Sequence, residues 1–341
     1  MAPLKMLNLQ DPPEAPANPV MAVVVPVYGN EESIPALLDA LADVAQTLRT
    51  TLGVDLEAMF VVDGSPDHSE AVLASLLPHC PFPAQLVTHS RNFGSFAAIR
   101  TGLAHAEADF YGVLAADLQE PPALLANFAA ALTAGDHDIA VGVRTGRDDP
   151  AASAWASRCF WSLYRRFVNP EIPAGGVDVF ACSRRVRDAL VALGEANTSL
   201  IGQLYWLGFR RAEVPYRRQR RQHGRSGWTF ARKVRYMLDS VFAFTDLPIR
   251  LLALLGATCV AVSVGWAAAV VFAKLVGGVP VSGYAALAVM TLFFGGINAV
   301  GVGIAGAYAW RAYENTKGRP LSLTSSQRVF RAAATPRRHA A

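Results

Sequence analysis

Apolar and polar positions follow two different periods in the first part of the chain, and together they predict a layered α/β domain. Short apolar runs rich in β-branched residues, such as MAVVVPVY at 21–28, have the length and composition of buried strands. Between these runs lie stretches with apolar residues at helical spacing, such as ESIPALLDALADVAQTLRT at 32–50. This alternation is typical of a Rossmann-like, mostly parallel sheet covered by helices on both faces.

The same pattern predicts further elements along the chain. Strands are expected in EAMFVVDGS, QLVTHS and FYGVLAADL, and helices in SEAVLASLLPH, FAAIRTGLAHA and PPALLANFAAALTAG. Beyond residue 146 the pattern loosens, and the expected elements are a helix in ASAWASRCFWSLYRRFV, a strand in GGVDVFACSRR, a helix in VRDALVAL and an edge strand in RRAEVPYRRQ. The globular domain is therefore expected to extend from 21 to 225.

Two long uncharged runs follow this domain. No residue from 251 to 273 and none from 275 to 310 carries a charge. Because a membrane helix needs about 20 apolar residues, each run is long enough to span, and the glycines and proline of KLVGGVPVSG between them suit a turn. The pattern predicts two transmembrane helices at 249–275 and 284–310, with a pair of buried core helices as the alternative.

Positive charge is concentrated on both sides of this predicted hairpin. The formal net charge is +4, and basic residues crowd the segment 210–235 before the first run and recur after the second. The positive-inside rule then places the globular domain and both termini in the cytoplasm, as expected for a multi-pass protein of the inner (cytoplasmic) membrane. Because the basic clusters lie next to the predicted spans, a lipid bilayer is the expected partner and nucleic acid is not.

The segments around these elements carry weaker patterns. Residues 226–248 combine basic and aromatic side chains, which predicts an interfacial helix on the bilayer, with an ordinary surface helix as the alternative. Residues 1–20 have no apolar signal-peptide core and are expected to form a disordered leader, and 320–341 are expected to form a disordered cytoplasmic tail. The four cysteines show no metal or disulfide spacing, which fits a reducing compartment.

Polar side chains stand where three of the predicted strands end. Pro26 and Tyr28 end the first strand, Asp63 follows the second, and Asp117 follows the strand in FYGVLAADL. Ligands of parallel α/β sheets bind beyond the carboxyl ends of the strands. These residues are therefore expected to converge on one crevice.

LAADLQEPP at 114–122 places a carboxylate and an amide on the same side of a strand end. Asp117 and Gln119 offer oxygen ligands, which Mg²⁺ and Mn²⁺ prefer, often with substrate phosphates completing the coordination. The spacing predicts a divalent cation and a diphosphate ligand. Asp63, in VVDGSPD, can accept hydrogen bonds from a base or a ribose, or can hold a structural turn.

The order of the motifs carries a resemblance to a known family. VVVPVYGNEESIPALL, VVDGSPDHS, SRNFGSFAAIRTGL, ADLQEPP, GGVDVFACSRRV and RRQHGRSGW, followed by a hairpin and AGAYAWRAYENTKGRP, resemble the family 2 glycosyltransferases. More narrowly they resemble the polyprenyl-phosphate glycosyltransferases, relatives of dolichol-phosphate mannose synthase. The resemblance implies a GT-A fold and inverting transfer of a sugar from a nucleotide sugar, most simply a UDP-sugar, to undecaprenyl phosphate in a cell-envelope glycan pathway.

The resemblance also implies a role for each motif residue. The nucleotide would be held by Pro26, Tyr28, Asn30 and Asp63. The divalent metal, Mg²⁺ or Mn²⁺, would be bound by Asp117 and Gln119. The catalytic aspartate would be Asp178, and phosphate groups would be met by Arg218, Arg221 and Ser226.

The chain departs from the family pattern at several positions. The first aspartate of the usual metal motif is Ala115, the usual DDGS begins with Val62, and two positions that often hold lysine are Ser95 and Gly227. Loss of these charged groups is expected to weaken electrostatic capture of the donor and the metal.

The acceptor decides what Asp178 has to do. A phosphate monoester has a second pKa near 6, so a lipid phosphate arrives already ionised, and Asp178 is expected to orient or stabilise charge and not to act as an obligatory base. Two other functions stay open. One is transfer to a saccharide hydroxyl, which would make Asp178 a true base, and the other is a degenerate transferase that acts as a binding scaffold. The oligomeric state is also open, with a homo-oligomer as one option.

Overall fold

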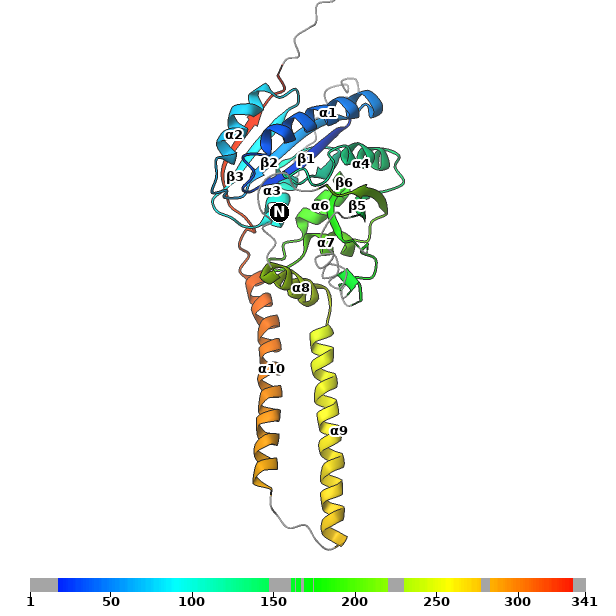
Figure 1. Ribbon diagram of the computed structural model, residues 1–341, viewed down its shortest axis with the longest axis vertical. Coiled ribbons are helices and arrows are strands. Elements are labelled where there is room, and N and C mark those ends of the chain that lie inside the picture. Colours follow the sequence, from blue (N-terminus) through cyan, green and yellow to red (C-terminus); the bar gives the residue numbers. More distant parts are fainter. Residues whose placement is uncertain are drawn as a thin grey trace, which may run out of the picture.

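An eight-stranded sheet forms the centre of the N-terminal domain, and two long helices extend away from that domain (Figure 1). The structure is a computed structural model that describes residues 18–146, 161–162, 164–166, 169–173, 175–219, 230–276 and 283–333. Its strands are β1 Val20–Val27, β2 Asp55–Val62, β3 Ala84–His89, β4 Phe110–Val113, β5 Ile139–Gly146, β6 Val177–Ser183, β7 Arg211–Arg217 and β8 Thr324–Phe330. Its helices are α1 Ile34–Leu52, α2 Ser69–Leu76, α3 Ser95–His105, α4 Leu124–Thr133, α6 Arg184–Ala192, α7 Leu200–Trp206, α8 Phe230–Phe244, α9 Leu247–Val276 and α10 Tyr284–Thr316, with a 3₁₀ turn η1 at Leu77–His79.

The direction of each strand decides which residues meet. The strand order is β7-β5-β6-β4-β1-β2-β3-β8, and β1 to β4 are mutually parallel. Strand β6 is antiparallel to β4 and β5, β8 is antiparallel to β3, and β7 is parallel to β5. Strands β4, β5 and β7 therefore end at the edge where β6 begins. The predicted mostly parallel α/β sheet is confirmed.

The central strand β1 is apolar throughout because both of its faces are covered. Val23 and Val25 pack into the core cluster to which α1, α2 and α4 contribute, whereas Ala22 and Val24 pack into the cluster of α3, α6 and α7. All four side chains are completely buried. A continuous apolar run, in place of strict alternation, is what a strand buried on two faces requires.

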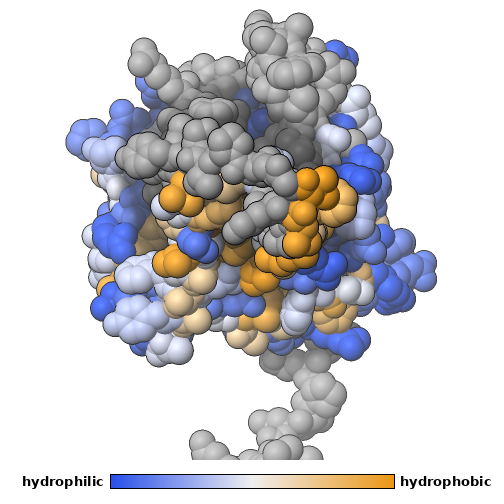
Figure 2. All heavy atoms as spheres, turned by 90° about the horizontal axis from the view of Figure 1, so that it is seen from below, coloured by the Kyte–Doolittle hydropathy of each residue, from blue (hydrophilic) through white to orange (hydrophobic). Residues whose placement is uncertain are grey.

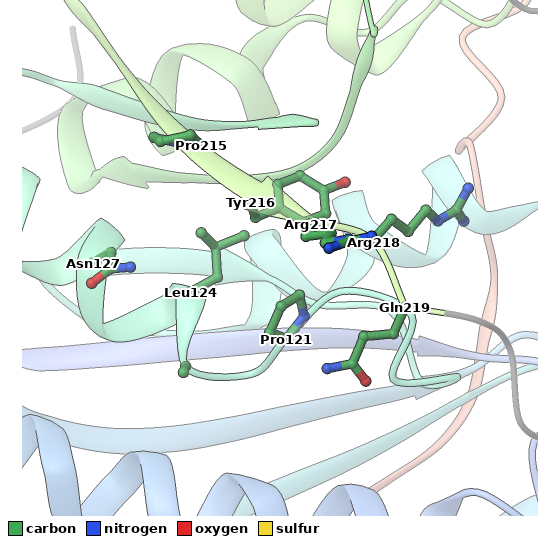
Figure 3. Close-up of a pocket in the computed structure, with 9 residues that line it drawn as sticks. Pro121, Leu124, Asn127, Pro215, Tyr216, Arg217, Arg218 and Gln219 are labelled. Atoms are coloured by element: carbon green, nitrogen blue, oxygen red, sulfur yellow. The ribbon is translucent and has the colours of Figure 1, made fainter. Parts of the chain in front are cut away.

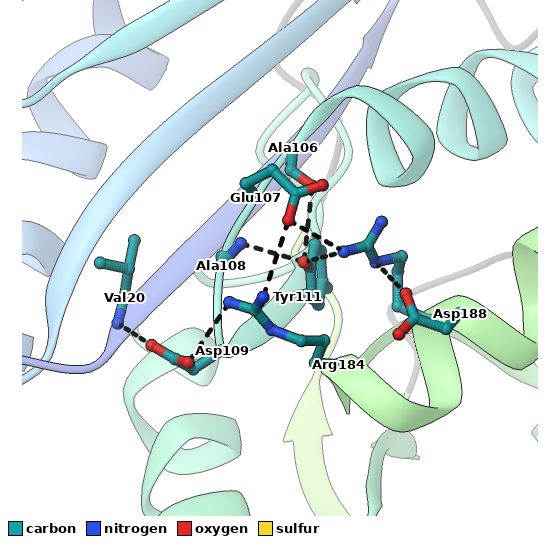
Figure 4. A network of polar contacts seen from close by, with 9 residues as sticks. Val20, Ala106, Glu107, Ala108, Asp109, Tyr111, Arg184 and Asp188 are labelled. Carbon is teal, nitrogen blue, oxygen red and sulfur yellow. Dashed lines mark hydrogen bonds and ion pairs between the residues drawn. The ribbon is translucent and has the colours of Figure 1, made fainter. Parts of the chain in front are cut away.

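A polar network ties the sheet together at the edge where β1 and β4 begin (Figure 4). Asp109, just before β4, accepts a hydrogen bond from the Val20 amide at 2.9 Å and lies 3.5 Å from the Arg184 guanidinium at the start of α6. One turn later, Arg187 donates to the Tyr111 hydroxyl at 2.7 Å. These contacts hold β1, β4 and α6 together at the edge opposite the predicted crevice.

The segment that follows the hairpin is not a disordered tail, so the prediction for 320–341 is wrong over Thr324–Phe330. These residues form β8, which pairs with β3 in antiparallel fashion and sets Phe330 opposite Ala84. Without β8, β3 would present an open edge of unpaired backbone groups. Backbone pairing needs no apolar periodicity, and LSLTSSQRVF shows little, so the sequence pattern missed this strand.

Helices α9 and α10 correspond to the predicted hairpin. They begin at Leu247 and Tyr284, and the apolar windows Leu247–Trp266 and Phe293–Thr316 are long enough to cross a membrane, with 0% of each window buried. Seen from the hairpin end, apolar side chains occupy the middle of the molecule and hydrophilic ones surround them (Figure 2). The exposure of α9 and α10 excludes the alternative of two buried core helices.

One end of α10 lies next to α8 (Figure 1), and polar contacts there join the hairpin to the globular domain. Arg311 of α10 pairs with Asp239 of α8 at 2.7 Å and donates to the Asn197 carbonyl at 3.3 Å. The Ala196 amide donates to the Asn315 side chain at 3.1 Å. The predicted interfacial helix at 226–248 overlaps α8, and its position on a bilayer stays a prediction.

Candidate active site

Four strands bring polar side chains to one edge of the sheet. Residues 117–120 follow β4, Arg144 lies near the end of β5, and Asp178 is the second residue of β6. Tyr216 and Arg218 lie at the end of β7. Because β6 runs against β4 and β5, its first residues face the ends of its neighbours. This clustering is consistent with the prediction that the site lies at this edge of the sheet.

Asp178 is held by two neighbours. Arg144 donates through Nη2 to Oδ1 at 2.8 Å, and its Nε lies 2.7 Å from Oδ2. The Tyr216 hydroxyl donates to Oδ2 at 2.9 Å. Burial raises the pKa of Tyr216, and the charges of Asp178 and Glu120 raise it further, so this phenol stays a donor. Hydrogen bonds to both oxygens fix the orientation of the Asp178 carboxylate.

Arg218 bridges the loop after β4. Its Nη2 donates to Gln119 Oε1 at 2.8 Å, and its Nε lies 3.2 Å from Glu120 Oε1. Glu120 is 1% exposed, and burial raises its pKa to about 7, with the charges of Asp178 and Asp117 adding to the rise and Arg218 opposing it. Among the described residues, Glu120 Oε2 has no hydrogen-bond partner. Arg218, together with Arg144, therefore stabilises the charged form of this buried carboxyl.

The donor set around Asp117 fits a hard divalent cation that also binds substrate phosphates. Leu118 takes a left-handed conformation with φ 55°, which sets Asp117 and Gln119 on a tight turn, and the Gln119 amide donates to Asp117 Oδ1 at 3.3 Å. The described residues contain no group of three or more His, Cys, Asp or Glu side chains that could hold a metal. One carboxylate and one amide oxygen would then need a diphosphate to complete the coordination. Gln119 has a second lone pair beside the one that Arg218 uses.

Asp63 anchors the loop after β3. It is 2% exposed, and its oxygens accept hydrogen bonds from His89 Nδ1 at 2.8 Å and from the amides of Phe93 and Gly94 at 2.8 and 2.7 Å. Burial would raise the pKa of Asp63, but these hydrogen bonds outweigh it and the pKa lies below its usual value. Asp63 thus has the structural role that the sequence left as an alternative, and its contact with a nucleotide stays a prediction.

The loop after β1 lies between Asp63 and the loop after β4. Tyr28 is 50% exposed, Pro26 is partly buried, and the Tyr28 amide donates to Asn30 Oδ1 at 3.0 Å. Ser33 donates to the Ala116 carbonyl at 2.9 Å in a buried contact. The predicted nucleotide residues and the predicted metal residues are therefore neighbours on one edge.

We expect Gly64→Ala to lower the free energy of unfolding by roughly 2–4 kcal/mol, since a left-handed alanine costs about 1–2 kcal/mol and overpacking adds a similar amount. Gly64 has φ 59°, and an added Cβ would lie 2.4 Å from backbone atoms of Arg91 and Asn92. Gly53 has φ 63° and open space, so Gly53→Ala is a matched control that carries the backbone cost alone. Chemical denaturation measures both, and equal losses would contradict the close contact.

A pocket of about 400 Å³ opens beside the cluster, between the start of α4 and the end of β7 (Figure 3). It shares Tyr216 and Arg218 with the site. Its lining residues are Pro121, Ala123, Leu124, Asn127, Pro215, Tyr216, Arg217, Arg218 and Gln219. The cluster is therefore accessible from this side of the sheet.

Sequence reasoning missed three residues of the cluster. Arg144 lies on β5, a strand that was not predicted although IAVGVRTG at 139–146 carries the apolar signal. Tyr216 stands on the predicted edge strand without an assigned role, and Glu120 adjoins the predicted metal ligands. Two predicted phosphate-binding residues, Arg221 and Ser226, lie outside the described residues.

Comparison with known proteins places the chain in a family. The family described as "Glycosyl transferase family 2" matches residues 22–190. The SfII prophage-derived bactoprenol glucosyl transferase of Shigella flexneri is 30% identical over 301 residues, which cover 88% of this chain and 96% of that protein. The chain belongs to glycosyltransferase family 2. It is a glycosyltransferase, and the predicted GT-A-like fold is confirmed.

A second relative supports the narrower resemblance. This glycosyltransferase is 29% identical over 303 residues to the undecaprenyl-phosphate 4-deoxy-4-formamido-L-arabinose transferase of Pseudomonas savastanoi pv. phaseolicola, covering 88% of each chain. Among solved structures, glucosyl-3-phosphoglycerate synthase from Mycobacterium tuberculosis, in complex with Mn²⁺, UDP and glucosyl-3-phosphoglycerate, is 19% identical with a TM-score of 0.45, over 61% of this chain and 74% of that one. The predicted resemblance to the polyprenyl-phosphate branch is confirmed by the two named relatives.

Proposed function

We propose that this glycosyltransferase transfers a sugar, with inversion, from a UDP-sugar to undecaprenyl phosphate at the cytoplasmic face of the inner membrane, in a pathway that builds or modifies cell-envelope glycans. The likeness to the bactoprenol glucosyl transferase carries the proposal. An alignment over 88% of the chain has to reach into the apolar hairpin as well as the catalytic domain. The likeness therefore includes the part of the chain that would meet a lipid.

The contacts of Asp178 favour a phosphate acceptor over a hydroxyl acceptor. A hydroxyl nucleophile needs a base that can take its proton, whereas a phosphate monoester with a second pKa near 6 is already mostly ionised at neutral pH. Both oxygens of Asp178 are engaged by Arg144 and Tyr216. Asp178 would then hold these two donors in place and shape the charge at the reacting centre.

The departing nucleoside diphosphate needs positive charge at the same edge. Asp117 and Gln119 would hold Mg²⁺ or Mn²⁺, which supplies charge neutralisation for the diphosphate. Arg218 is already fixed at this edge by Gln119 and Glu120. It would orient a phosphate group without having to order a free side chain.

The hairpin would anchor the enzyme with its catalytic domain in the cytoplasm. We expect reporter tags at either terminus to be cytoplasmic and a tag inserted at 277–283 to lie across the membrane, because basic residues flank the two uncharged runs at 251–273 and 275–310. Protease protection of the tags in membrane vesicles provides the measurement. A cytoplasmic loop tag would mean that the hairpin does not span.

Incubation of purified protein with undecaprenyl phosphate and a panel of nucleotide sugars, followed by mass analysis of the lipids, tests the function. A glycosylated lipid formed from a UDP-sugar supports the proposal, and one formed only from another nucleotide sugar corrects the donor. Transfer to a saccharide, with none to the lipid, would support the hydroxyl-acceptor alternative. Nucleotide binding without transfer to either acceptor would support a scaffold.

A further inference from the structure

A chain of hydrogen bonds links the segment that leaves the membrane hairpin to the predicted nucleotide site. The Ser322 hydroxyl lies 2.7 Å from Thr101 Oγ1, and Thr101 Oγ1 lies 2.9 Å from His89 Nε2. His89 Nδ1 lies 2.8 Å from Asp63 Oδ1. His89 and Asp63 are each 2% exposed and Thr101 is 7% exposed. Ser322 is half-buried, so the buried part of the chain runs from Thr101 to Asp63, where water cannot easily replace a partner that is removed.

The chemistry of the groups gives this chain a direction. An ionised Asp63 only accepts, so Nδ1 of His89 carries the proton that it donates. At the other ring nitrogen, Nε2 contacts the Thr101 hydroxyl, whose oxygen contacts the Ser322 hydroxyl, so both hydroxyls can donate toward Asp63. Each hydroxyl thereby fixes the orientation of the next group toward Asp63.

Ser322 belongs to the segment that connects the hairpin to β8, and this segment is fixed at both ends. It lies between the end of α10 at Thr316 and the start of β8 at Thr324. The neighbouring Leu323 carbonyl accepts from the Ser90 amide at 2.9 Å, and β8 pairs along β3. Its place therefore depends on both the hairpin and the sheet.

At the other end, Asp63 controls two loops of the predicted nucleotide site. It accepts from the amides of Phe93 and Gly94, which fixes the loop before α3. The turn that follows Asp63 holds the loop after β1, because Ser65 Oγ accepts from the Gly29 amide at 2.8 Å. A shift of Asp63 would move both loops.

We propose that Ser322, Thr101 and His89 are positioning residues for the nucleotide donor. Through Asp63 they hold the loops on both sides of the donor site, so that donor affinity depends on the segment that returns from the membrane hairpin. This inference rests on the proposed function, because it takes Asp63 and its loops to be the nucleotide site.

The test removes the hydroxyls from the full-length protein with Thr101→Val and Ser322→Ala. Loss of one buried hydrogen bond is expected to weaken binding of UDP or GDP, titrated by calorimetry, roughly three- to tenfold, and to raise the KM for the nucleotide sugar by the same factor. The kcat and the KM for undecaprenyl phosphate are expected to change by less than about twofold, because a nucleotide-positioning role acts on the donor alone.

Two sets of controls separate positioning from general stability. Thr101→Ser and Ser322→Thr keep the hydroxyls and are expected to restore nucleotide affinity. Ser325→Ala removes a side-chain hydrogen bond to the Thr88 carbonyl between β8 and β3. This bond is not part of the series from Ser322 to Asp63, so nucleotide affinity is expected to stay unchanged.

The outcomes distinguish this inference from the function on which it rests. Wild-type affinity in both Thr101→Val and Ser322→Ala would overturn the inference and leave the proposed function standing. A fall in kcat with unchanged nucleotide affinity, or an equal effect of Ser325→Ala, would also overturn it, since either would indicate a purely structural role. Wild-type protein that binds neither UDP nor GDP and transfers no sugar would overturn both.

Discussion

Replacing Asp117 by alanine is expected to lower the rate of sugar transfer roughly 10³-fold or more. A divalent metal contributes several kcal/mol to charge stabilisation at phosphate groups, and each ~1.4 kcal/mol is worth tenfold in rate. Asp117 is the carboxylate of the two predicted metal ligands, on the turn that Leu118 sets with φ 55°. Turnover of purified Asp117→Ala with saturating donor and lipid phosphate provides the measurement.

Asp109→Ala is the matched control for Asp117→Ala. It removes a carboxylate from the opposite edge of the sheet, where Asp109 contacts Val20 and Arg184, and is expected to keep transfer. Wild-type protein in EDTA should lose activity as Asp117→Ala does. Unchanged transfer in either condition would contradict the metal site. Because Ala115 leaves the site one carboxylate short, a rate that is already saturated at micromolar Mg²⁺ would also be unexpected.

Replacing Asp178 by asparagine is expected to leave measurable transfer, with a loss smaller than the roughly 10²- to 10⁴-fold that an essential base contributes. The structure supplies the reason, since Arg144 and Tyr216 already engage both Asp178 oxygens. The rate should rise with pH across the titration of the acceptor phosphate near pH 6. The pH–rate profile of Asp178→Asn with saturating lipid phosphate measures this.

Stability has to be followed in the same variant. The Arg144 side chain is 5% exposed, and loss of its anionic partner leaves a buried cation unpaired, which is destabilising by about 3–5 kcal/mol. Arg144→Gln combined with Asp178→Asn removes both charges and is expected to be more stable than Asp178→Asn alone. No turnover at any pH between about 6 and 9, in folded Asp178→Asn that still binds both substrates, would show that Asp178 is indispensable and that acceptor ionisation does not suffice.

Local sequence patterns determined most of the elements and gave the prediction of a metal site after β4. Apolar runs of strand length recur between helical stretches, and a run without charges cannot form a soluble exposed helix, so the α/β domain and the hairpin could both be predicted. Strand alternation predicted that Asp117 and Gln119 share one face, but β4 ends at Val113 and a turn through the left-handed Leu118 places both residues. The apolar signal of 139–146 was present as well, and its strand was overlooked.

Only the tertiary structure decided which polar groups meet. Asp178 contacts Arg144 and Tyr216 from positions 34 and 38 residues away, and Thr101 contacts Ser322 across 221 residues. Apolar periodicity specifies which face of a strand is buried, but not its neighbours or its direction. The antiparallel β6 turns Asp178 toward the ends of β5 and β7, and the backbone edge of β3 recruits β8. The pairing of strands is made by backbone hydrogen bonds between distant segments, and these bonds leave no local pattern in the side chains.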